Sequence, residues 1–340
     1  MATTGRRVLV TGGAGFIGSH VAAAFLRRGD EVVVLDNLVH GSRGRVPAGA
    51  DFVEMDVRDP AMEMLVREGR FDVVDLHAAQ IDVRDSVARP RHDAGVNVDG
   101  LLNVLEAVRA AERGRVVFAS SGGAVYGDAR TRPTPEGAGK RPESPYGVGK
   151  LAGEQYLHCF HRTHGLDYVA LRYANVYGPG QDPFGEGGVV AVFCSRLAEG
   201  SPLTIYGDGE QTRDYVHVAD VVRANLIAAD AALPRGASVD SRAFNVGTGS
   251  QTSVNALASV LMHAAGAPAL VKRAAARPGE VRRSALSAEK LRRLGWRPEV
   301  SLEQGLRETW EWVRTQSAPA PEPAAAPAHR VHRRATAGVG

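Results

Sequence analysis

The sequence has little of what marks secreted, membrane-spanning or nucleic-acid-binding proteins. Its 340 residues include only two cysteines, Cys159 and Cys194, which are too few for a disulfide scaffold and lie at a spacing that fits no metal site. No apolar run reaches the roughly 20 residues that span a bilayer, and the first apolar strand begins too early to leave room for a signal peptide. The net charge is only +3, and no basic stripe is interleaved with aromatic residues. We therefore expect a cytoplasmic enzyme with no metal, no nucleic-acid partner and no membrane partner.

What the sequence does contain is a regular alternation of apolar runs and helical periods. It is 44% hydrophobic and 23% charged, which is typical of a soluble globular protein. Unbroken apolar runs are typical of parallel strands buried on both faces, and helical segments between them predict an α/β fold with a Rossmann-type, doubly wound parallel sheet. The expected strands cover residues 8–10, 31–35, 51–55, 71–76, 115–121 and 168–173, and residues 93–111 are expected to form one long helix.

A glycine-rich turn joins the first strand to the first helix, with the spacing Gly12-x-x-Gly15-x-x-Gly18. Glycines at such a junction allow a tight turn and a close approach to a pyrophosphate, which the helix N-terminus at Phe16 and Ile17 attracts. Asp36 ends the second strand about 20 residues further on, where a partner for a ribose 2′-hydroxyl is expected. Because its carboxylate would repel a 2′-phosphate, NAD is favoured over NADP, although Arg43 and Arg45 keep NADP open as an alternative.

Further cofactor contacts are expected where the parallel strands end, since the cleft lies at that edge of the sheet. Asp56 follows the third strand and is expected either to accept the adenine amino group or to cap the next helix. The remaining residues assigned to the cofactor site are Asn37, Val57, Ala78, Ala79, Gln80, Asn97, Tyr146, Lys150 and Tyr173.

From Val176 onward, glycine and proline become frequent, which predicts a long functional loop followed by shorter elements. We expect residues 1–176, with residues 217–250 returning to them, to form the NAD-binding domain. Residues 177–216 and 251–316 are expected to form a smaller C-terminal α/β lobe that binds the substrate. The Pro/Ala-rich segment 317–340 cannot bury enough apolar surface to offset its ordering entropy, so we expect it to be disordered.

Tyr146 and Lys150 lie four residues apart in a predicted helix over residues 144–164, so their side chains share one face. An unperturbed tyrosine has a pKa near 10, and a nearby ammonium group lowers that pKa by favouring the phenolate. Tyr146 is therefore the expected base that removes a hydroxyl proton from the substrate. Ser120 and Ser121 end the fifth strand, and one of their hydroxyls is expected to assist; Ser121 is preferred.

Several motifs, taken together, resemble the extended short-chain dehydrogenase/reductase family, in its sugar-nucleotide epimerase/dehydratase branch. Within that branch the resemblance is closest to the UDP-glucose 4-epimerases, and it runs from Arg7 to Trp312. The motifs are Thr11-Gly-Gly-Ala-Gly-Phe-Ile-Gly18, His77-Ala-Ala-Gln80, Ser120-Ser-Gly-Gly-Ala-Val-Tyr126, Tyr146-x-x-x-Lys150, Leu171-Arg-Tyr-Ala-Asn-Val-Tyr-Gly178, Arg213-Asp-Tyr-Val-His217 and Arg277-Pro-Gly-Glu280.

The resemblance implies a sugar-nucleotide site and a homodimer. Arg213 and Arg277 would clamp the diphosphate, the segment from Thr204 to Tyr206 would lie by the base, and Glu280 would accept from the ribose. The full set that the resemblance implies for the substrate is Arg84, Ser121, Tyr146, Asn175, Val189, Thr204, Tyr206, Arg213, Arg277 and Glu280.

The chain departs from the family pattern in ways that bear on the reaction. Gly122 stands where better-known epimerases have Ser or Thr, so the hydroxyl role is expected to pass to Ser121. Dehydratases of this branch have an acidic pair where this chain has Gly123 and Ala124, which cannot transfer protons. The resemblance therefore implies a 4-epimerase of the UDP-glucose/UDP-galactose type, acting through a 4-keto sugar. Ser284 is a small residue at a position that limits sugar size in some epimerases, so a UDP-glucuronate or UDP-N-acetylhexosamine 4-epimerase is an alternative. A non-catalytic NAD-binding relative is a further alternative. The base of the sugar nucleotide, uracil or thymine, stays open.

Overall fold

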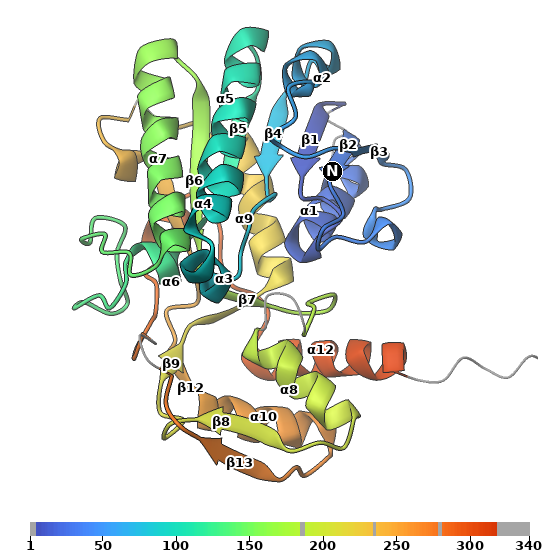
Figure 1. Ribbon diagram of the computed structural model, residues 1–340, viewed down its shortest axis with the longest axis vertical. Coiled ribbons are helices and arrows are strands. Elements are labelled where there is room, and N and C mark those ends of the chain that lie inside the picture. Colours follow the sequence, from blue (N-terminus) through green and yellow to red (C-terminus); the bar gives the residue numbers. More distant parts are fainter. Residues whose placement is uncertain (1–4, 184–187, 234–235, 278–280, 318–340) are drawn as a thin grey trace, which may run out of the picture.

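A seven-stranded parallel sheet forms the centre of the larger part of the molecule (Figure 1). The computed structural model describes residues 5–183, 188–233, 236–277 and 281–317. The strand order is β11-β6-β5-β4-β1-β2-β3, which reverses direction between β1 and β4 as in doubly wound folds. The strands are β1 (Arg7–Thr11), β2 (Glu31–Asp36), β3 (Asp51–Glu54), β4 (Val73–Leu76), β5 (Arg115–Ser121), β6 (Asp167–Tyr173) and β11 (Ala243–Val246). The predicted fold class is confirmed.

Helices cover both faces of this sheet because its strands are apolar on both sides. Along β1, Val8 and Val10 pack beneath one helical layer and Leu9 beneath the other. The first layer contains α1 (Phe16–Arg27) and α9 (Val218–Asp230), and the second contains α2 (Met62–Gly69), α5 (Gly100–Ala111) and α7 (Pro145–His164).

A smaller α/β unit lies beyond the carboxyl ends of the large sheet (Figure 1). Phe193, Leu203, Leu257 and Trp310 belong to its separate apolar core. Its main elements are α8 (Val189–Ala198), β8 (Leu203–Tyr206), α10 (Val254–Ala265), β13 (Val271–Ala274) and α12 (Leu302–Ser317), with β8 and β13 paired in parallel. Two short pairs connect it to the large sheet, namely β7 (Asn175–Tyr177) with β10 (Tyr215–His217), and β9 (Thr212–Arg213) with β12 (Thr252–Ser253).

Most predicted elements occur, with limits that shift by one to three residues, but the helix expected over residues 93–111 is wrong as a single helix. The structure has α4 (Pro90–Ala94), then a π-helical turn η2 (Gly95–Asp99), then α5. The helix α3 (Val83–Ala88), which comes just before α4, was not predicted. The loop expected from Val176 onward begins within the short strand β7. Of the predicted tail, residues 318–340 lie outside the described part of the chain. In that described part, no helix is both long enough and apolar enough to cross a membrane.

Candidate active site

The turn between β1 and α1 accepts only glycine at two of its positions. Gly12 has φ +67°, and a Cβ there would lie 2.5 Å from the backbone nitrogen of Ala78; a Cβ at Gly18 would lie 2.2 Å from the carbonyl oxygen of Gly12. The N-cap of α1, Gly15, makes no side-chain cap hydrogen bond. Because the start of α1 has no side-chain cap and its turn is built from glycines, its first backbone N–H groups can bind the pyrophosphate of a dinucleotide.

Asp36 lies beside this turn and organises it. Its carboxylate accepts from the N–H of Ala14 at 3.0 Å and from that of Leu38 at 2.8 Å. Each oxygen keeps a second lone pair, so Asp36 can still accept from a ribose hydroxyl. Its position fits the predicted role.

Asn37 and Asp56 meet where β2 and β3 end. The Asn37 amide donates to Asp56 at 2.8 Å, and Arg58 donates to both oxygens of Asp56 at 2.8 Å. The Arg58 hydrogen bonds hold the pKa of Asp56 well below its usual range. The alternative that Asp56 caps the next helix is wrong, because α2 has Ala61 as its N-cap.

Asn97 fixes the loop after β4 through hydrogen bonds to its backbone. The Asn97 side chain accepts from the Gln80 N–H at 3.0 Å and donates to the Gln80 carbonyl at 2.8 Å. At the same loop, Ala78 donates its N–H to the Thr11 hydroxyl at 3.3 Å. Asn97 sits in the π-helical turn, a feature frequent at functional sites. Sequence reasoning assigned Gln80 and Asn97 to the cofactor without finding that they bind each other.

Tyr146 and Lys150 lie in the first turns of α7, which begins sharply because Ser144 caps it and Pro145 takes its first position. The Lys150 ammonium lies 5.8 Å from the centroid of the Tyr146 ring and donates to the Ala119 carbonyl at 2.9 Å. Lys150 is only 5% exposed. A nearby cation and the positive end of a helix dipole both favour a phenolate at Tyr146, so the phenol can serve as a base.

The two serines at the end of β5 face different surroundings. Ser120 is buried, and its hydroxyl donates to Glu154 at 2.6 Å. Ser121 is the N-cap of the short helix α6 (Gly122–Val125), and its hydroxyl accepts from the Ala124 N–H at a long 3.4 Å. This difference favours Ser121 as the hydroxyl available to a substrate.

The structure explains why residue 122 is glycine rather than serine or threonine. A Cβ at this position would lie 2.4 Å from Cδ1 of Leu286, whereas a Cβ at Gly123 would have no atom within 4 Å. Leu286 therefore occupies the space that a Ser or Thr side chain at residue 122 would need.

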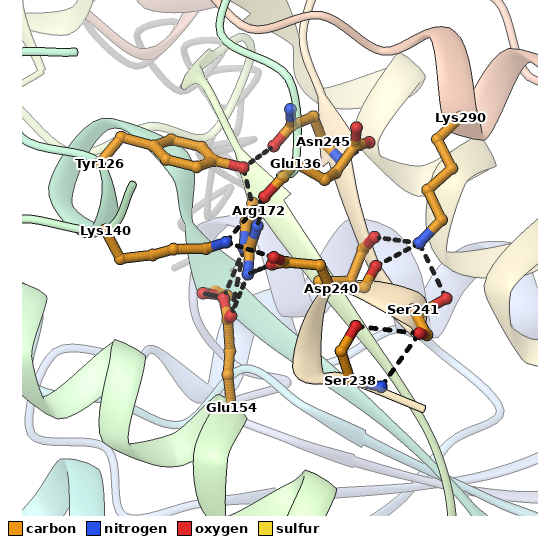
Figure 2. Close-up of polar contacts among 12 residues, drawn as sticks. Tyr126, Glu136, Lys140, Glu154, Arg172, Ser238, Asp240, Ser241, Asn245 and Lys290 are labelled. Carbon is orange, nitrogen blue, oxygen red and sulfur yellow. Dashed lines mark hydrogen bonds and ion pairs between the residues drawn. The ribbon is translucent and has the colours of Figure 1, made fainter. Parts of the chain in front are cut away.

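A buried polar network joins α7 to the sheet (Figure 2). Arg172, fully buried in β6, donates through Nε to Glu154 of α7 at 2.9 Å and through Nη1 to the Tyr126 hydroxyl at 2.8 Å. Tyr126 in turn donates to Asn245 of β11 at 2.8 Å, and burial raises the pKa of its phenol. Sequence reasoning gave this network no role, although an arginine inside an apolar strand was a signal for it.

Tyr173, assigned to the cofactor, is buried beneath the end of the sheet. Its ring lies nearly parallel to that of His77, with centroids 6.4 Å apart, and its hydroxyl donates to Asn225 at 2.9 Å. Burial raises the pKa of this phenol well above its ordinary value, so Tyr173 is suited to packing rather than to proton transfer.

Several residues assigned to the substrate lie on the smaller unit. Alternation along β8 buries Leu203 and Ile205 and leaves Thr204 and Tyr206 on the other face, where the Arg277 guanidinium lies 3.8 Å from the centroid of the Tyr206 ring. Val189 begins α8.

The other assigned substrate residues lie on three further elements. Arg213 is partly buried in β9, and Ser284 donates its N–H to the neighbouring Thr212 carbonyl at 3.1 Å. Asn175 is exposed at the start of β7, and Arg84 is exposed on α3. Glu280 lies outside the described residues.

Asp214, which sequence reasoning missed, ties the segments around Arg213 together. Its buried carboxylate accepts from the N–H groups of Thr248, Gly249 and Leu286 at 2.9–3.1 Å. Burial raises the pKa of Asp214, and these donors oppose that rise.

Another groove lies at the opposite edge of the sheet, at the amino ends of the strands. It is lined by charged side chains that pair with one another, such as Arg115 with Asp167 and Arg6 with Asp230. Because these charges neutralise one another, the groove is a weaker candidate for the functional site than the carboxyl ends of the strands.

Known proteins of similar sequence and structure indicate the family to which this chain belongs. A sequence model of the "NAD dependent epimerase/dehydratase family" matches residues 8–247. A UDP-glucose 4-epimerase of Mycolicibacterium smegmatis is 42% identical over 317 residues, which cover 92% of this chain and 99% of that protein. The crystal structure of a Thermotoga maritima UDP-glucose 4-epimerase with UDP-glucose has a TM-score of 0.86 and 44% identity, and covers 91% of this chain and 99% of that one. A Thermus thermophilus UDP-glucose 4-epimerase complex with NAD has a TM-score of 0.84 and 44% identity at the same coverage. With the resemblance seen in the sequence thereby confirmed, the chain belongs to the NAD-dependent epimerase/dehydratase family.

Proposed function

We propose that this chain is an NAD-dependent 4-epimerase of nucleoside-diphosphate sugars, of the UDP-glucose/UDP-galactose type. The observation that carries the proposal is the Tyr146–Lys150 pair at the start of α7, close to the end of β5 and at the sheet edge that carries the glycine turn. Bound NAD would supply a hydride acceptor and donor for C4 of the sugar. No net redox change results, so the cofactor is recycled in place.

In this proposal, the chain's own residues move one proton and hold the reactants. Tyr146 removes the proton of the 4-hydroxyl and returns it at the end of the cycle, while Lys150 keeps the phenolate favoured. Ser121 donates a hydrogen bond to the reacting oxygen. The alternative position, Ser120, is already bound to Glu154.

Epimerisation is favoured over dehydration because the chain offers no side chain for the second proton transfer. Gly123 and Ala124 stand where an acid and a base would be needed, and the position of Gly123 opens onto free space.

We propose that the cofactor is held by the residues at the strand ends and by the glycine turn. Gly12, Gly15, Phe16, Ile17 and Gly18 would bind the pyrophosphate. Asp36 and Asn37 would bind the adenosine ribose, and Asp56 with Val57 the adenine. Ala78, Ala79 and Gln80 would lie by the pyrophosphate and ribose, and Asn97 and Tyr173 would complete the cofactor site.

The smaller unit would bind the sugar nucleotide. Arg213 and Arg277 are suited to a diphosphate because a guanidinium fork matches its oxygens. Tyr206 and Thr204, on the open face of β8, would lie by the base together with Val189, and Asn175 and Arg84 would complete the contacts. Glu280 is assigned to the nucleoside ribose.

A second candidate, a 4-epimerase of UDP-glucuronate or a UDP-N-acetylhexosamine, is kept because of Ser284. This small residue is bound next to Arg213 through the Thr212 carbonyl, so it would leave room for a larger sugar substituent.

The test is incubation of the purified protein with a panel of UDP- and dTDP-sugars, without added reductant, and separation of the C4 epimers. We expect interconversion of UDP-glucose and UDP-galactose, and loss of turnover by orders of magnitude in Tyr146→Phe with nucleotide affinity retained. Stoichiometric consumption of NADH, or unchanged turnover in Tyr146→Phe, would contradict the proposal.

We also propose that the protein is a homodimer. Exposed apolar side chains occur on α3 and α7, which pack against each other: Val83 and Val87 on α3, and Val148 and Tyr156 on α7. Covering such a patch favours self-association. Light scattering coupled to gel filtration should give twice the chain mass of 36.0 kDa, and a Val87→Asp/Val148→Asp variant should be monomeric; a monomeric parent protein would contradict this.

We place the enzyme in the cytoplasm, because Cys159 and Cys194 are both free thiols and one of them is exposed, as suits a reducing compartment. Cell fractionation tests this, and recovery outside the cytoplasm would refute it.

A further inference from the structure

Asp93 of α4 is a buried acid between the cofactor loop and the catalytic helix. It is 1% exposed. Its Oδ1 accepts from the Gln80 amide and from the Asn97 amide, each at 3.0 Å. Gln80 belongs to the loop after β4, and Asn97 to the π-helical turn η2. Because both partners are donors, the ionised carboxylate suits this position better than the neutral acid.

The other oxygen of Asp93 faces α7. A Cβ at Gly149 would lie 3.5 Å from Oδ2 of Asp93. The carboxylate therefore approaches the backbone of α7 at the residue next to Lys150, in the turn that also carries Tyr146. One buried acid thus contacts the cofactor loop, the π-helical turn and the helix of the proposed base.

We propose that Asp93 is a positioning residue for the reaction assigned to Tyr146: its carboxylate holds Gln80 and Asn97 beneath the cofactor and supplies the negative charge that balances the Lys150 ammonium. The role of Asp93 in epimerisation depends on the proposed function, but its effect on the Tyr146 phenol does not.

The other charged groups around Asp93 are either bound to a partner of opposite charge or exposed. Asp85 of α3 is bound to Arg89 at 2.7 and 2.8 Å, and Glu154 of α7 is bound to Arg172 of β6. The other charged or titratable groups nearby on α3, α4 and η2 are exposed, where solvent screens them; they are Arg84, Arg91, His92 and Asp99.

The pKa of Asp93 reflects the same balance of effects. Burial raises it above its ordinary value, and the Gln80 and Asn97 donors and the Lys150 charge oppose that rise without cancelling it. A carboxylate that responds to Lys150 must act on Lys150 in return, because the interaction is mutual.

Removing this negative charge should lower the pKa of every titratable group around it. The Asp93→Asn variant keeps the shape of the side chain and an acceptor for both amides, so it isolates the charge. We expect the pKa of Tyr146 to fall by about one unit, as is typical when a neighbouring charge is removed from a partly buried site. A purely structural role predicts the opposite, since loosening α7 would let water in and return that pKa toward 10.

The measurement is an ultraviolet difference titration of the phenolate, taken as each protein minus its Tyr146→Phe counterpart, which needs no turnover. Asp99→Asn on η2 is the matched control, because it removes the same charge from an exposed site of a neighbouring turn, and it should leave the titration unchanged. Asp93→Glu, which keeps the charge, should also titrate as the parent does, and it decides the matter if Asp93→Asn does not fold.

An unchanged or raised Tyr146 pKa in Asp93→Asn, or a displaced titration in Asp93→Glu, would overturn the proposal for Asp93. If the titrations shift as expected while no sugar nucleotide is epimerised, only the proposed function fails. With turnover present, both limbs of the pH profile of kcat in Asp93→Asn should move about one unit to lower pH.

Discussion

Replacing Gly12 by alanine tests whether the turn after β1 needs glycine for its backbone angle or for its contact. A left-handed backbone costs an alanine about 1–2 kcal/mol. At Gly12 a second cost arises, because the new Cβ would lie 2.5 Å from the backbone nitrogen of Ala78. A backbone atom cannot turn aside as a side chain can, so the turn or the loop after β4 must shift, which costs about a further 1–3 kcal/mol.

Gly266 provides a matched control for this prediction. It has φ +60°, close to the +67° of Gly12, but a Cβ there would meet no atom within 4 Å. Gly266→Ala should therefore carry only the cost of the backbone angle. Chemical denaturation should show Gly12→Ala to be less stable than Gly266→Ala by about 1–3 kcal/mol, and equilibrium titration should show at least a roughly tenfold loss of NAD affinity in Gly12→Ala alone, since 1.4 kcal/mol is tenfold in Kd. Equal losses of stability in the two variants, with NAD affinity retained, would refute the contact argument.

Two further predictions separate structural from functional polar groups. Ser120→Ala should lower the free energy of unfolding by about 1.5–3 kcal/mol, because a buried hydrogen bond to a carboxylate is lost. Ser121→Ala should lower kcat about a hundredfold, with a smaller loss of stability, about 0.5 kcal/mol, from its long N-cap hydrogen bond. Denaturation and initial rates on both variants check this, and the reverse pattern would assign the catalytic hydroxyl to Ser120. Burial lowers the pKa of Lys290 from 10.5 to about 8, so between these pH values the unfolded chain binds more protons and stability rises with pH. Denaturation at pH 8 and pH 10 should show this rise in the parent protein and a smaller one in Lys290→Met, and equal rises in both would exclude Lys290 as the cause.

The parts of the site that depend on local spacing could be predicted from the sequence. Gly12, Gly15 and Gly18 mark a turn within one strand and one helix, and Tyr146 with Lys150 requires only helical periodicity. The class of the sheet followed for the same reason, because each strand and each helix carries its own apolar pattern.

The parts that depend on distant packing could not be predicted. Ser120 and Ser121 could not be separated because the choice depends on Glu154, which α7 brings to the end of β5. Gly122 looked like a missing hydroxyl until Leu286 was seen to occupy its space.

The π-helical turn that carries Asn97 was missed for a related reason. One extra residue per turn leaves the apolar pattern of residues 93–111 compatible with a plain helix. Asp93 went unnoticed with it, because its partners Gln80 and Asn97 lie on other elements.

The central claim is that one carbon of the sugar is oxidised and then reduced by the same captive cofactor, with Tyr146 moving the proton. The most direct measurement is epimerisation of a UDP-hexose deuterated at C4, followed by mass spectrometry of both epimers. The account predicts that the deuterium stays at C4 in the product, with no uptake of solvent hydrogen and no added reductant. Loss of the label to solvent, or product formed only as NADH is consumed, would contradict it.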